Sequence, residues 1–580
     1  MVLQYPSRAE LIRELKKGYD YVCISFLLAV FHRMKEVVAL VRTHSPASQI
    51  VLGGYGTVLS DEALKPYADH ICREEGVAFM RRLLNEPEIP MPYRHPLIVS
   101  RLNIFSKEAS QTGMIFAGLG CPNGCDFCCT SHFFKRRHIR LLPTGKDIYN
   151  VIERYLAINP DMVFTILDED FLLNKARAME FRDCVIRGGR SLSIFAFASI
   201  KALSQYKIEE ILEMGIDGVW IGYEGARSGY AKQQGRSTRE LFKELKEHGV
   251  TILASMIVGL PYQNAAIIRN ELDGLLALRP DLSQFLIYGP TPGTPFYERI
   301  MNEGLLHQEL VENKESYYRK CSGFTAMVQH PSLAPREIEE AQERCFKQDY
   351  ERLGPSLFRV IDTYLAGYHK LRNSSNPLLR KKSRWFAAQV RNAYPIFLAG
   401  RLLGSNSEIK RWISGLERRC YHEFGKPNTI ERLASLGALA LALWTGLKLK
   451  LGIFQHPRLA RHPYRMPLES PQPGRIWRRL RRRIDVISVE LRSERSVWVR
   501  VEGLLSASQA HELGAQLRAA LERGREHLVL DLTKLTHLCP DAAKKLATNL
   551  RRSRQRVRLI TPTFAHPRVA VWLALFDLYR

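Results

Sequence analysis

The chain has 580 residues, which is too long for one domain and predicts three or four. Hydrophobic residues make up 46% of it and charged residues 25%, ordinary values for a soluble globular protein that exclude wholesale disorder. The formal net charge of +26 indicates an anionic partner, either nucleic acid or an acidic lipid surface.

The chain starts without a signal-peptide pattern. Residues 1–10 are polar and run into a helix-like segment rich in lysine, leucine and glutamate. Eleven cysteines, an odd number, suit a reducing compartment better than a disulfide framework. We therefore predict a cytoplasmic protein, peripheral to the inner face of the membrane if lipid is its partner.

Residues 19–85 alternate between strand-like and helix-like patterns. The runs 19–26 and 49–56 read as buried strands, the second ending in a glycine turn, and 31–41 reads as an amphipathic helix between them. Residues 69–79 read as a short strand that leads into a further helix. This alternation predicts a parallel, Rossmann-like sheet in a domain that spans 1–95.

Three cysteines follow the apolar run 113–120. Cys121, Cys125 and Cys128 have the spacing C-x3-C-x2-C on a Pro-Asn-Gly turn, so their thiolates converge on one inorganic centre. An iron-sulfur cluster fits three thiolates better than zinc, because a structural zinc site takes four ligands and only His132 offers a fourth nearby. A lone zinc site that includes His132 is the alternative.

Six strand-like runs separated by helical or loop segments lie between residues 113 and 305. They are 113–119, 162–167, 193–199, 218–223, 251–258 and 284–288. This pattern predicts a parallel, barrel-like α/β domain over 100–305, in which ligands bind at the carboxyl ends of the strands.

Candidate binding residues come directly after these strands. They are Asp168, Glu169 and Asp170 after the second strand, Ser199 after the third, Glu224 at the end of the fourth, and Gly259, Leu260 and Pro261 after the fifth. Alternative roles are a helix N-terminus for the acidic triplet and an ordinary turn hydroxyl for Ser199. A carboxylate at the end of a buried strand is costly unless it is hydrogen-bonded, which favours ligand contact for Glu224.

These motifs, in this order, resemble radical S-adenosylmethionine (SAM) enzymes. The matching features are C-x3-C-x-Phe-Cys with Phe127 before the third cysteine, the acidic triplet, Ile-Gly-x-Glu ending at Glu224, Gly-Leu-Pro at 259–261 and Pro-Gly-Thr-Pro ending at Pro295. The resemblance implies a partial (β/α)6 barrel. It also implies that the three cysteines bind a [4Fe-4S] cluster with one open iron, to which SAM binds. Cys129 is then a packing residue beside the cluster.

The resemblance implies the activity as well. One electron from the cluster cleaves SAM, and the resulting 5′-deoxyadenosyl radical abstracts hydrogen from an unactivated C–H bond. The expected product is a lipid-like molecule that has been coupled or rearranged. A reductant such as flavodoxin or ferredoxin is the expected electron donor. No catalytic residue beyond the cofactor-binding ones can be carried over. A non-catalytic metal-binding scaffold is the alternative from another class.

Cobalamin is left open as a further cofactor. Residues 1–95 resemble the second half of the cobalamin-binding domain that precedes many radical SAM barrels, but the Asp-x-His-x-x-Gly loop of such domains does not occur before Cys121. Two roles are open for the glycines at this turn, Gly53, Gly54 and Gly56. They either let the backbone pass close to a corrinoid or only allow a tight strand-to-helix turn. A cobalamin-dependent C-methyltransferase is therefore the alternative activity.

Residues 306–466 are mostly helical by pattern. Within them the run 433–447 is apolar and fifteen residues long, so it predicts a buried helix, a helix inserted in a membrane surface, or a short spanning helix. A linker rich in proline and arginine follows at 467–484, with six arginines in 475–483 that suit anionic headgroups or plain solvent. Nucleic acid is the less expected partner, because no RNA-binding module is recognisable.

Residues 485–580 follow the pattern β-β-α-β-α-β-α and resemble a STAS domain. In that family a strand leads to a phosphorylated Asp-Ser-Ser-Gly turn, whereas this chain has Cys-Pro-Asp-Ala at 539–542, without a serine. We therefore predict a STAS-like docking module that recruits a protein partner and carries no chemistry.

Overall fold

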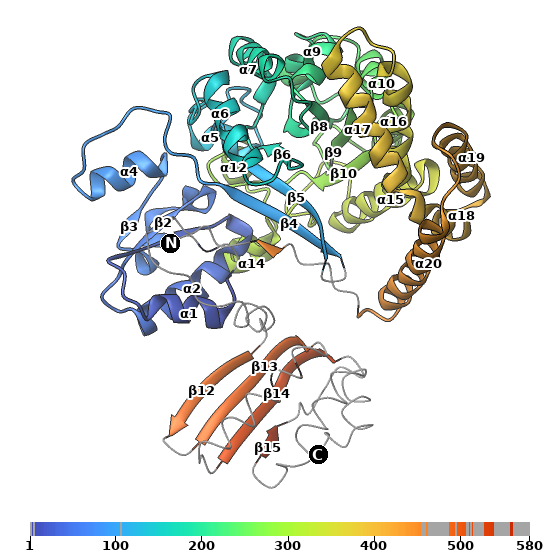
Figure 1. Ribbon diagram of the computed structural model, residues 1–580. Helices are drawn as coiled ribbons and strands as arrows, with labels where there is room; N and C mark the ends of the chain where they lie inside the picture. The colour runs from blue at the N-terminus through green and yellow to red at the C-terminus, as the bar shows by residue number, and fades with distance from the viewer. Residues whose placement is uncertain are drawn as a thin grey trace. The chain divides into compact units, whose positions relative to one another are not determined.

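The computed structural model describes residues 3, 6–104, 107–453, 460–461, 487–493, 496–505, 510, 513, 527–538 and 557–560 (Figure 1). The contacts divide the chain into two units. The larger comprises Gly18–Leu443 and Arg458–Tyr464, and the second comprises Met1–Lys17, Trp444–Pro457 and Arg465–Arg580. The domain boundaries predicted at 95, 305, 466 and 484 stay predictions.

The larger unit begins with a three-stranded parallel sheet in the order β1-β2-β3. The strands are β1 (Tyr21–Ser25), β2 (Gln49–Gly53) and β3 (His70–Ile71), and the helices between and after them are α2 (Phe31–His44), α3 (Asp61–Leu64) and α4 (Gly76–Leu83). Ile50, Val51 and Leu52 of the central strand are buried. The parallel sheet expected from residues 19–85 is confirmed.

The glycine turn after β2 is explained by packing alone. Gly54 has φ +82°, and a Cβ atom on it would lie 2.6 Å from Ser25 Oγ. A Cβ atom on Gly56 would lie 2.3 Å from the ring of Phe26. Both positions therefore need glycine for the strand-to-helix turn, whether or not a corrinoid binds there.

An eight-stranded sheet in the order β10-β9-β8-β7-β6-β5-β4-β11 forms the centre of the larger unit. Its strands are β4 (Ile98–Ile104), β5 (Lys107–Ile115), β6 (Val163–Ile166), β7 (Ile194–Phe197), β8 (Ile216–Glu224), β9 (Thr251–Val258), β10 (Leu282–Ile287) and β11 (Ala460–Arg461). The strands β5 to β10 are parallel, and β6 to β10 coincide with five of the six predicted runs, whereas β5 overlaps the first run only in part. Closure into a partial barrel stays a prediction.

Two strands of this sheet were not predicted. β4 pairs antiparallel with β5, and β11 pairs antiparallel with β4. The first strand of the predicted barrel also differs in its bounds, because β5 ends at Ile115 and the chain continues to the cysteines as a loop. The mixed α/β class with parallel sheets is confirmed.

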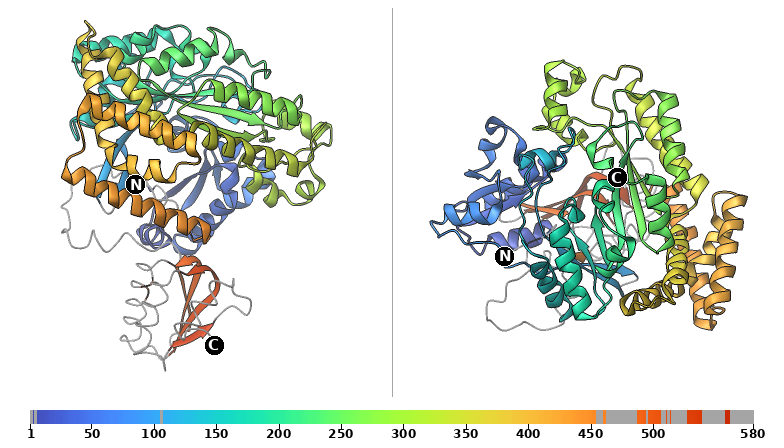
Figure 2. Two further views of the ribbon diagram at one scale, coloured as in Figure 1. Left: turned by 90° about the vertical axis from the view of Figure 1, so that its right-hand side faces the viewer. Right: turned by 90° about the horizontal axis from the view of Figure 1, so that it is seen from above.

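Helices surround this sheet and continue beyond it (Figures 1 and 2). Those between the strands are α5 (Cys129–Phe133), α6 (Gly145–Leu156), α7 (Lys175–Gly188), α8 (Ile200–Leu203), α9 (Ile208–Glu213), α10 (Thr238–Glu247) and α11 (Ala265–Ala277). Those that follow β10 are α12 (Pro295–Asn302), α13 (Gln308–Glu312), α14 (Lys314–Lys320), α15 (Pro335–Leu353), α16 (Ser356–Leu371), α17 (Pro377–Asn392), α18 (Phe397–Leu403), α19 (Ser407–Phe424) and α20 (Thr429–Lys450). The helical character predicted from residue 306 onward is confirmed over the part that the structure describes.

The prediction of a buried helix over 433–447 is wrong. The run lies within α20, and none of the residues of that helix is buried. Its residues are exposed or half-buried, so the helix is not part of a core. The helix is long and apolar enough to cross a membrane by length and composition, and it is the one such helix among the described residues.

The second unit contains α1 (Arg8–Leu15) and a four-stranded sheet in the order β12-β13-β14-β15. β12 (Ile487–Ser493) is antiparallel to β13 (Ser496–Leu505), whereas β14 (His527–Leu538) and β15 (Val557–Ile560) continue the sheet in parallel. These are the strands predicted within 485–580. Most of the predicted helix 507–521, the 539–542 turn and the 467–484 linker lie outside the described residues, so the STAS-like assignment stays a prediction.

A buried cation joins the helices after the sheet to the amino-terminal edge of the sheet. The side chain of Lys382, in α17, is 1% exposed, and its Nζ donates to Asp217 Oδ2 at 2.9 Å and to Gly215 O at 3.2 Å. It also donates to the carbonyl of Leu192. A buried ammonium group is tolerated only when its donors are used in this way.

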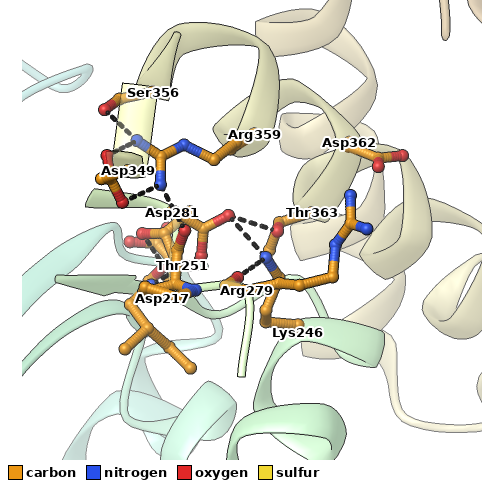
Figure 3. Close-up of polar contacts among 12 residues, drawn as sticks. Asp217, Lys246, Thr251, Arg279, Asp281, Asp349, Ser356, Arg359, Asp362 and Thr363 are labelled. Atoms are coloured by element: carbon orange, nitrogen blue, oxygen red, sulfur yellow. Dashed lines mark hydrogen bonds and ion pairs between the residues drawn. The ribbon is translucent and has the colours of Figure 1, made fainter. Parts of the chain in front are cut away.

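Two further carboxylates complete this edge (Figure 3). Asp281 directly precedes β10 and is fully buried. It accepts hydrogen bonds from Thr363 Oγ1 at 2.6 Å and from Lys246 Nζ at 3.2 Å. Asp349 forms a two-point ion pair with Arg359, with N–O distances of 3.0 and 2.7 Å. These contacts fix α15 and α16 against the ends of the strands, because a bidentate pair defines both distance and orientation.

Replacing Lys382 tests this arrangement. Lys382→Met leaves Asp217 buried without its cation, and we expect the free energy of unfolding to fall by about 3–5 kcal/mol. The neighbouring Lys381 is exposed and donates to Gly189 O at 2.6 Å, so Lys381→Met should cost about 1 kcal/mol or less. Urea unfolding monitored by tryptophan fluorescence measures both, and equal losses would contradict the role of Lys382.

Candidate functional site

The three cysteines lie in a loop between β5 and α5, at the carboxyl edge of the eight-stranded sheet. Cys121 and Cys125 are buried, and Cys128 is half-buried. Ser131 holds the loop closed, because its hydroxyl donates to Cys121 O at 2.6 Å and accepts from Gly124 N at 2.9 Å. Gly124 has φ +71°, a backbone conformation that favours glycine at this turn.

The thiols of this loop lie within electrostatic reach of one another. Burial raises the pKa of Cys121 to about 12 and that of Cys125 to about 11, and Cys128 adds to both shifts. Metal binding requires thiolates, so these groups suit a positively charged centre that removes the cost of their ionisation. The donor set therefore fits an iron-sulfur cluster, although no three His, Cys, Asp or Glu side chains in the described residues already surround a common metal position.

The predicted alternative with His132 as a fourth ligand gains no support from the geometry. His132 Nε2 donates to the carbonyl oxygen of Cys125 at 3.0 Å, so this ring nitrogen is used within the loop. Cys129 begins α5, and burial raises the pKa of its thiol to about 12.

Asp126, between two of the cysteines, ties the loop to segments that follow other strands of the sheet. Its carboxylate accepts from the hydroxyls of Tyr230 and Tyr288, each at 2.7 Å, and its backbone carbonyl accepts from Phe296 N at 3.1 Å. Arg299 Nη2 lies 3.7 Å from the same carboxylate. The cysteine loop is thus connected to the segments that follow β8 and β10.

Phe127 packs in an aromatic group around this connection. Its ring lies 5.3 Å from that of Tyr230 and 6.1 Å from that of Tyr288, edge to face in both pairs. Lys232 Nζ lies 5.6 Å from the centre of the Phe127 ring. Phe127, which directly precedes the third cysteine, therefore helps to orient the loop through its packing.

The acidic triplet after β6 divides into three different roles. Asp168 is buried in an ion pair with Arg177, with an N–O distance of 2.7 Å, and His138 Nε2 lies 3.1 Å from its other oxygen. Hydrogen bonds and charge from His138 and Arg177 hold the pKa of Asp168 below its usual value in spite of burial. The guanidinium of Arg177 also donates to Ala117 O at 2.8 Å. Through Arg177, Asp168 therefore helps to fix the segment that leads into the cysteine loop.

Asp170 holds two strand ends together. Its Oδ2 accepts from Asn123 Nδ2 at 2.9 Å, and its Oδ1 accepts from the backbone N–H of Ser199 at 3.1 Å. Ser199 Oγ caps α8 by accepting from Ala202 N at 3.0 Å, which is the turn role given as its alternative. The middle residue, Glu169, is the exposed carboxylate of the triplet.

Glu169 has the electrostatics of a cation-binding group. Surrounding protein and the charge of Asp168 raise its pKa to about 7, although the side chain reaches solvent. The hydroxyl of Tyr55 lies beside the Glu169 carboxylate and partly offsets the rise in its pKa. A ligand cation beside Glu169 would favour its ionised form.

Glu224 ends β8 in a strained conformation and has a partner that the sequence did not reveal. Its φ is +57°, in the left-handed region that a non-glycine residue seldom adopts, and the side chain is buried. Lys232 donates to its carboxylate and contributes a positive charge next to Cys125. The ion pair thus brings a cation to the cysteine loop.

The Gly-Leu-Pro turn after β9 borders a cavity of about 330 Å³. The N–H groups of Gly259 and Leu260 both donate to Gln263 Oε1, at 2.7 and 2.9 Å, so they are already satisfied. Gly259 and Pro261 line the cavity, together with residues that include Tyr288 and Arg299. Because the last two also contact Asp126, the cavity adjoins the cysteine loop. Its volume is at the lower end of the range for ligand pockets.

Sequence reasoning missed Asp126, Tyr230 and Lys232. Asp126 lies within the cysteine motif, and a carboxylate in an aromatic, half-buried loop is a signal for a hydrogen-bonded anchor. Tyr230 and Lys232 follow the fourth strand at the edge where ligands were expected, but on a loop whose path the sequence did not define.

Comparison with known proteins gives distant relatives. No protein-family model matches the sequence. The chain is 25% identical over 230 residues to an uncharacterized methyltransferase of Pyrococcus horikoshii, covering 38% of this chain and 48% of that protein, so it spans about half the length of that relative. It is 21% identical over 394 residues to an anaerobic magnesium-protoporphyrin IX monomethyl ester cyclase of Rubrivivax gelatinosus, covering 57% and 70%.

Among solved structures, the radical SAM methyltransferase TsrM of Kitasatospora setae, with cobalamin and a [4Fe-4S] cluster bound, aligns with a TM-score of 0.46 and 15% identity. The alignment covers 66% of this chain and 90% of TsrM. Both sequence relatives are enzymes that share no more than 25% identity with this chain, and the roles of the residues around the cysteine loop stay proposals.

The pKa of Glu169 leads to a pH-dependent prediction. Because folding raises the pKa of Glu169, its protonated carboxyl group contributes fully to the stability of the folded protein below pH 4.5, the ordinary pKa of glutamate. This contribution is lost as pH rises through about 7. Glutamine does not titrate, so Glu169→Gln removes this loss. In protein purified without iron, the melting temperature of the variant minus that of wild type should therefore increase from pH 5 to pH 8. Asp161→Asn, an exposed acid before β6, is the matched control and should show no such trend.

Proposed function

We propose that this chain is a radical SAM enzyme. The observation that carries the proposal is the C-x3-C-x2-C loop at the carboxyl edge of six parallel strands, held there by Asp126 and Asp170. The carboxyl edge of such a sheet is where ligands bind in parallel α/β domains. The distant relatives, a methyltransferase and a cyclase, support an enzyme of this kind.

Each group at this edge has a separate task in the proposal. Cys121, Cys125 and Cys128 hold a [4Fe-4S] cluster, which when bound supplies the electron for reductive cleavage of SAM. Glu169 is the exposed carboxylate that binds the amino group of SAM. Lys232 offsets negative charge beside the thiols, and its ion pair keeps Glu224 in place.

The remaining predicted contacts to SAM are assigned by position. Phe127 shapes the loop, and Asp170 and Ser199 position it. Gly259 and Pro261 line the cavity, and Leu260 lies between them in the same turn. Asp168 acts through Arg177 and does not itself reach the ligand. The cavity has aromatic and apolar walls, which include Tyr288 and Phe296, and polar groups such as Arg299 and His330.

The reaction that follows is hydrogen abstraction from an unactivated C–H bond, with a lipid-like molecule as the substrate class. A cobalamin-dependent C-methyltransferase is the second candidate, and the methyltransferase among the relatives favours it. A non-catalytic scaffold is disfavoured, because it has no need for an exposed carboxylate beside the cysteine loop. The expected partners are a reductant such as flavodoxin or ferredoxin and a protein bound by the STAS-like region.

Cysteine variants test the cluster assignment. Cys121→Ala, Cys125→Ala and Cys128→Ala should each abolish iron loading after anaerobic reconstitution, since each removes one of three ligands. Cys129→Ala is the matched control in the adjacent position and should keep its iron. Iron and sulfide analysis with electron paramagnetic resonance gives the answer, and normal cluster content in any of the first three variants would sink the assignment.

The products of SAM cleavage separate the two candidate reactions. We expect reconstituted protein with SAM and a strong reductant to form 5′-deoxyadenosine, measured by liquid chromatography with mass detection. Formation of S-adenosylhomocysteine only when cobalamin is added would instead establish the methyltransferase. If neither product forms and SAM does not bind, the chain is not a radical SAM enzyme.

A further inference from the structure

Helix α20 lacks the polar face that a soluble surface helix normally has. Leu433, Leu436 and Leu443 expose 64%, 58% and 54% of their surface, and none of the residues of the helix is buried. Across the apolar stretch only Ser435 and Thr445 carry polar side chains. A helix that is apolar on all sides is found in a protein core or in lipid, and the described part of this chain provides no core for it.

The first turn of α20 is fixed to the folded unit. The guanidinium of Arg391, in α17, donates to both carboxylate oxygens of Glu431, at 2.8 and 2.7 Å, and to Phe424 O at 2.8 Å. Asn428 Oδ1 accepts from Glu431 N at 2.9 Å and so caps the helix. The helix is therefore anchored at its first turn, and beyond that turn most of its leucines are exposed.

Positive charge flanks the apolar stretch. Arg432 precedes it, and Lys448 and Lys450 follow it. Lys448 Nζ lies 5.2 Å from the ring of Trp444, and such lysine and tryptophan side chains suit the boundary between headgroups and acyl chains. The sequence from 429 to 484 contains twelve lysines and arginines against two acidic residues, which complements an anionic surface.

We propose that α20 inserts into an anionic lipid bilayer and tethers the protein there. The whole helix is long enough to cross a membrane, but its stretch without charged residues, about 15 residues or about 22 Å, is shorter than the hydrocarbon core of about 30 Å. Both flanks are basic, so no charge asymmetry favours moving one end across the membrane. The helix therefore enters from one face, with its lysines at the headgroups. This inference does not depend on the proposed chemistry.

Vesicle flotation of the full-length chain tests the proposal. Wild type should float with vesicles of phosphatidylcholine containing about one third phosphatidylglycerol, more weakly with phosphatidylcholine alone, and high salt should reduce the bound fraction without abolishing it. The variant Leu436→Glu/Leu441→Glu places charges on two different faces of the helix. It should lower the bound fraction by roughly tenfold or more, because a charged side chain is costly in the hydrocarbon region.

The matched control is Leu27→Glu/Leu357→Glu, which changes two leucines that are 59% and 63% exposed outside α20. It should float like wild type, and both variants should keep the wild-type melting temperature. Equal flotation of the two variants overturns the proposal. So does a wild-type chain that stays with RNA or self-associates in light scattering but does not float, since the apolar helix would then serve another partner.

Discussion

The position of the cysteine loop depends on carboxylates that are buried or half-buried but hydrogen-bonded. Asp170 joins the loop to the start of α8, and Asp126 joins it to Tyr230 and Tyr288, which follow β8 and β10 at the same edge of the sheet. A carboxylate removed from water is costly unless its oxygens accept hydrogen bonds, so these groups stabilise one arrangement of the loop and penalise others. The loop is thus fixed by the strands that surround it and not only by its own turn.

The opposite edge of the same sheet follows the same physical rule. Lys382 pairs with Asp217, and Asp281 accepts from Thr363 and Lys246, so charged groups are buried only in partnership. Between the two edges the core is apolar, with residues such as Ile166, Ile221 and Phe285 fully buried. The amino edge therefore holds the helices that follow the sheet, while the carboxyl edge is left for chemistry.

Tethering to a membrane and the proposed reaction have a common physical basis in the composition. A chain of +26 net charge with an exposed apolar helix is attracted to anionic lipid by charge and retained by apolar contact. If the substrate is lipid-like, the same surface brings the enzyme to it. The connection of α20 to α17 through Arg391 links that surface to the unit that carries the cysteine loop.

The sequence by itself determined the order of the six parallel strands, the four strands of the second unit and the cysteine motif, because periodicity and motif spacing are local properties. It could not decide which of Asp168, Glu169 and Asp170 is exposed. That depends on Arg177 and on Asn123, which lies 47 residues from Asp170 in the chain. It predicted an apolar helix near residue 440 but not its exposure, since burial depends on whether another element covers it. Only the tertiary structure decides contacts between residues that are distant in sequence.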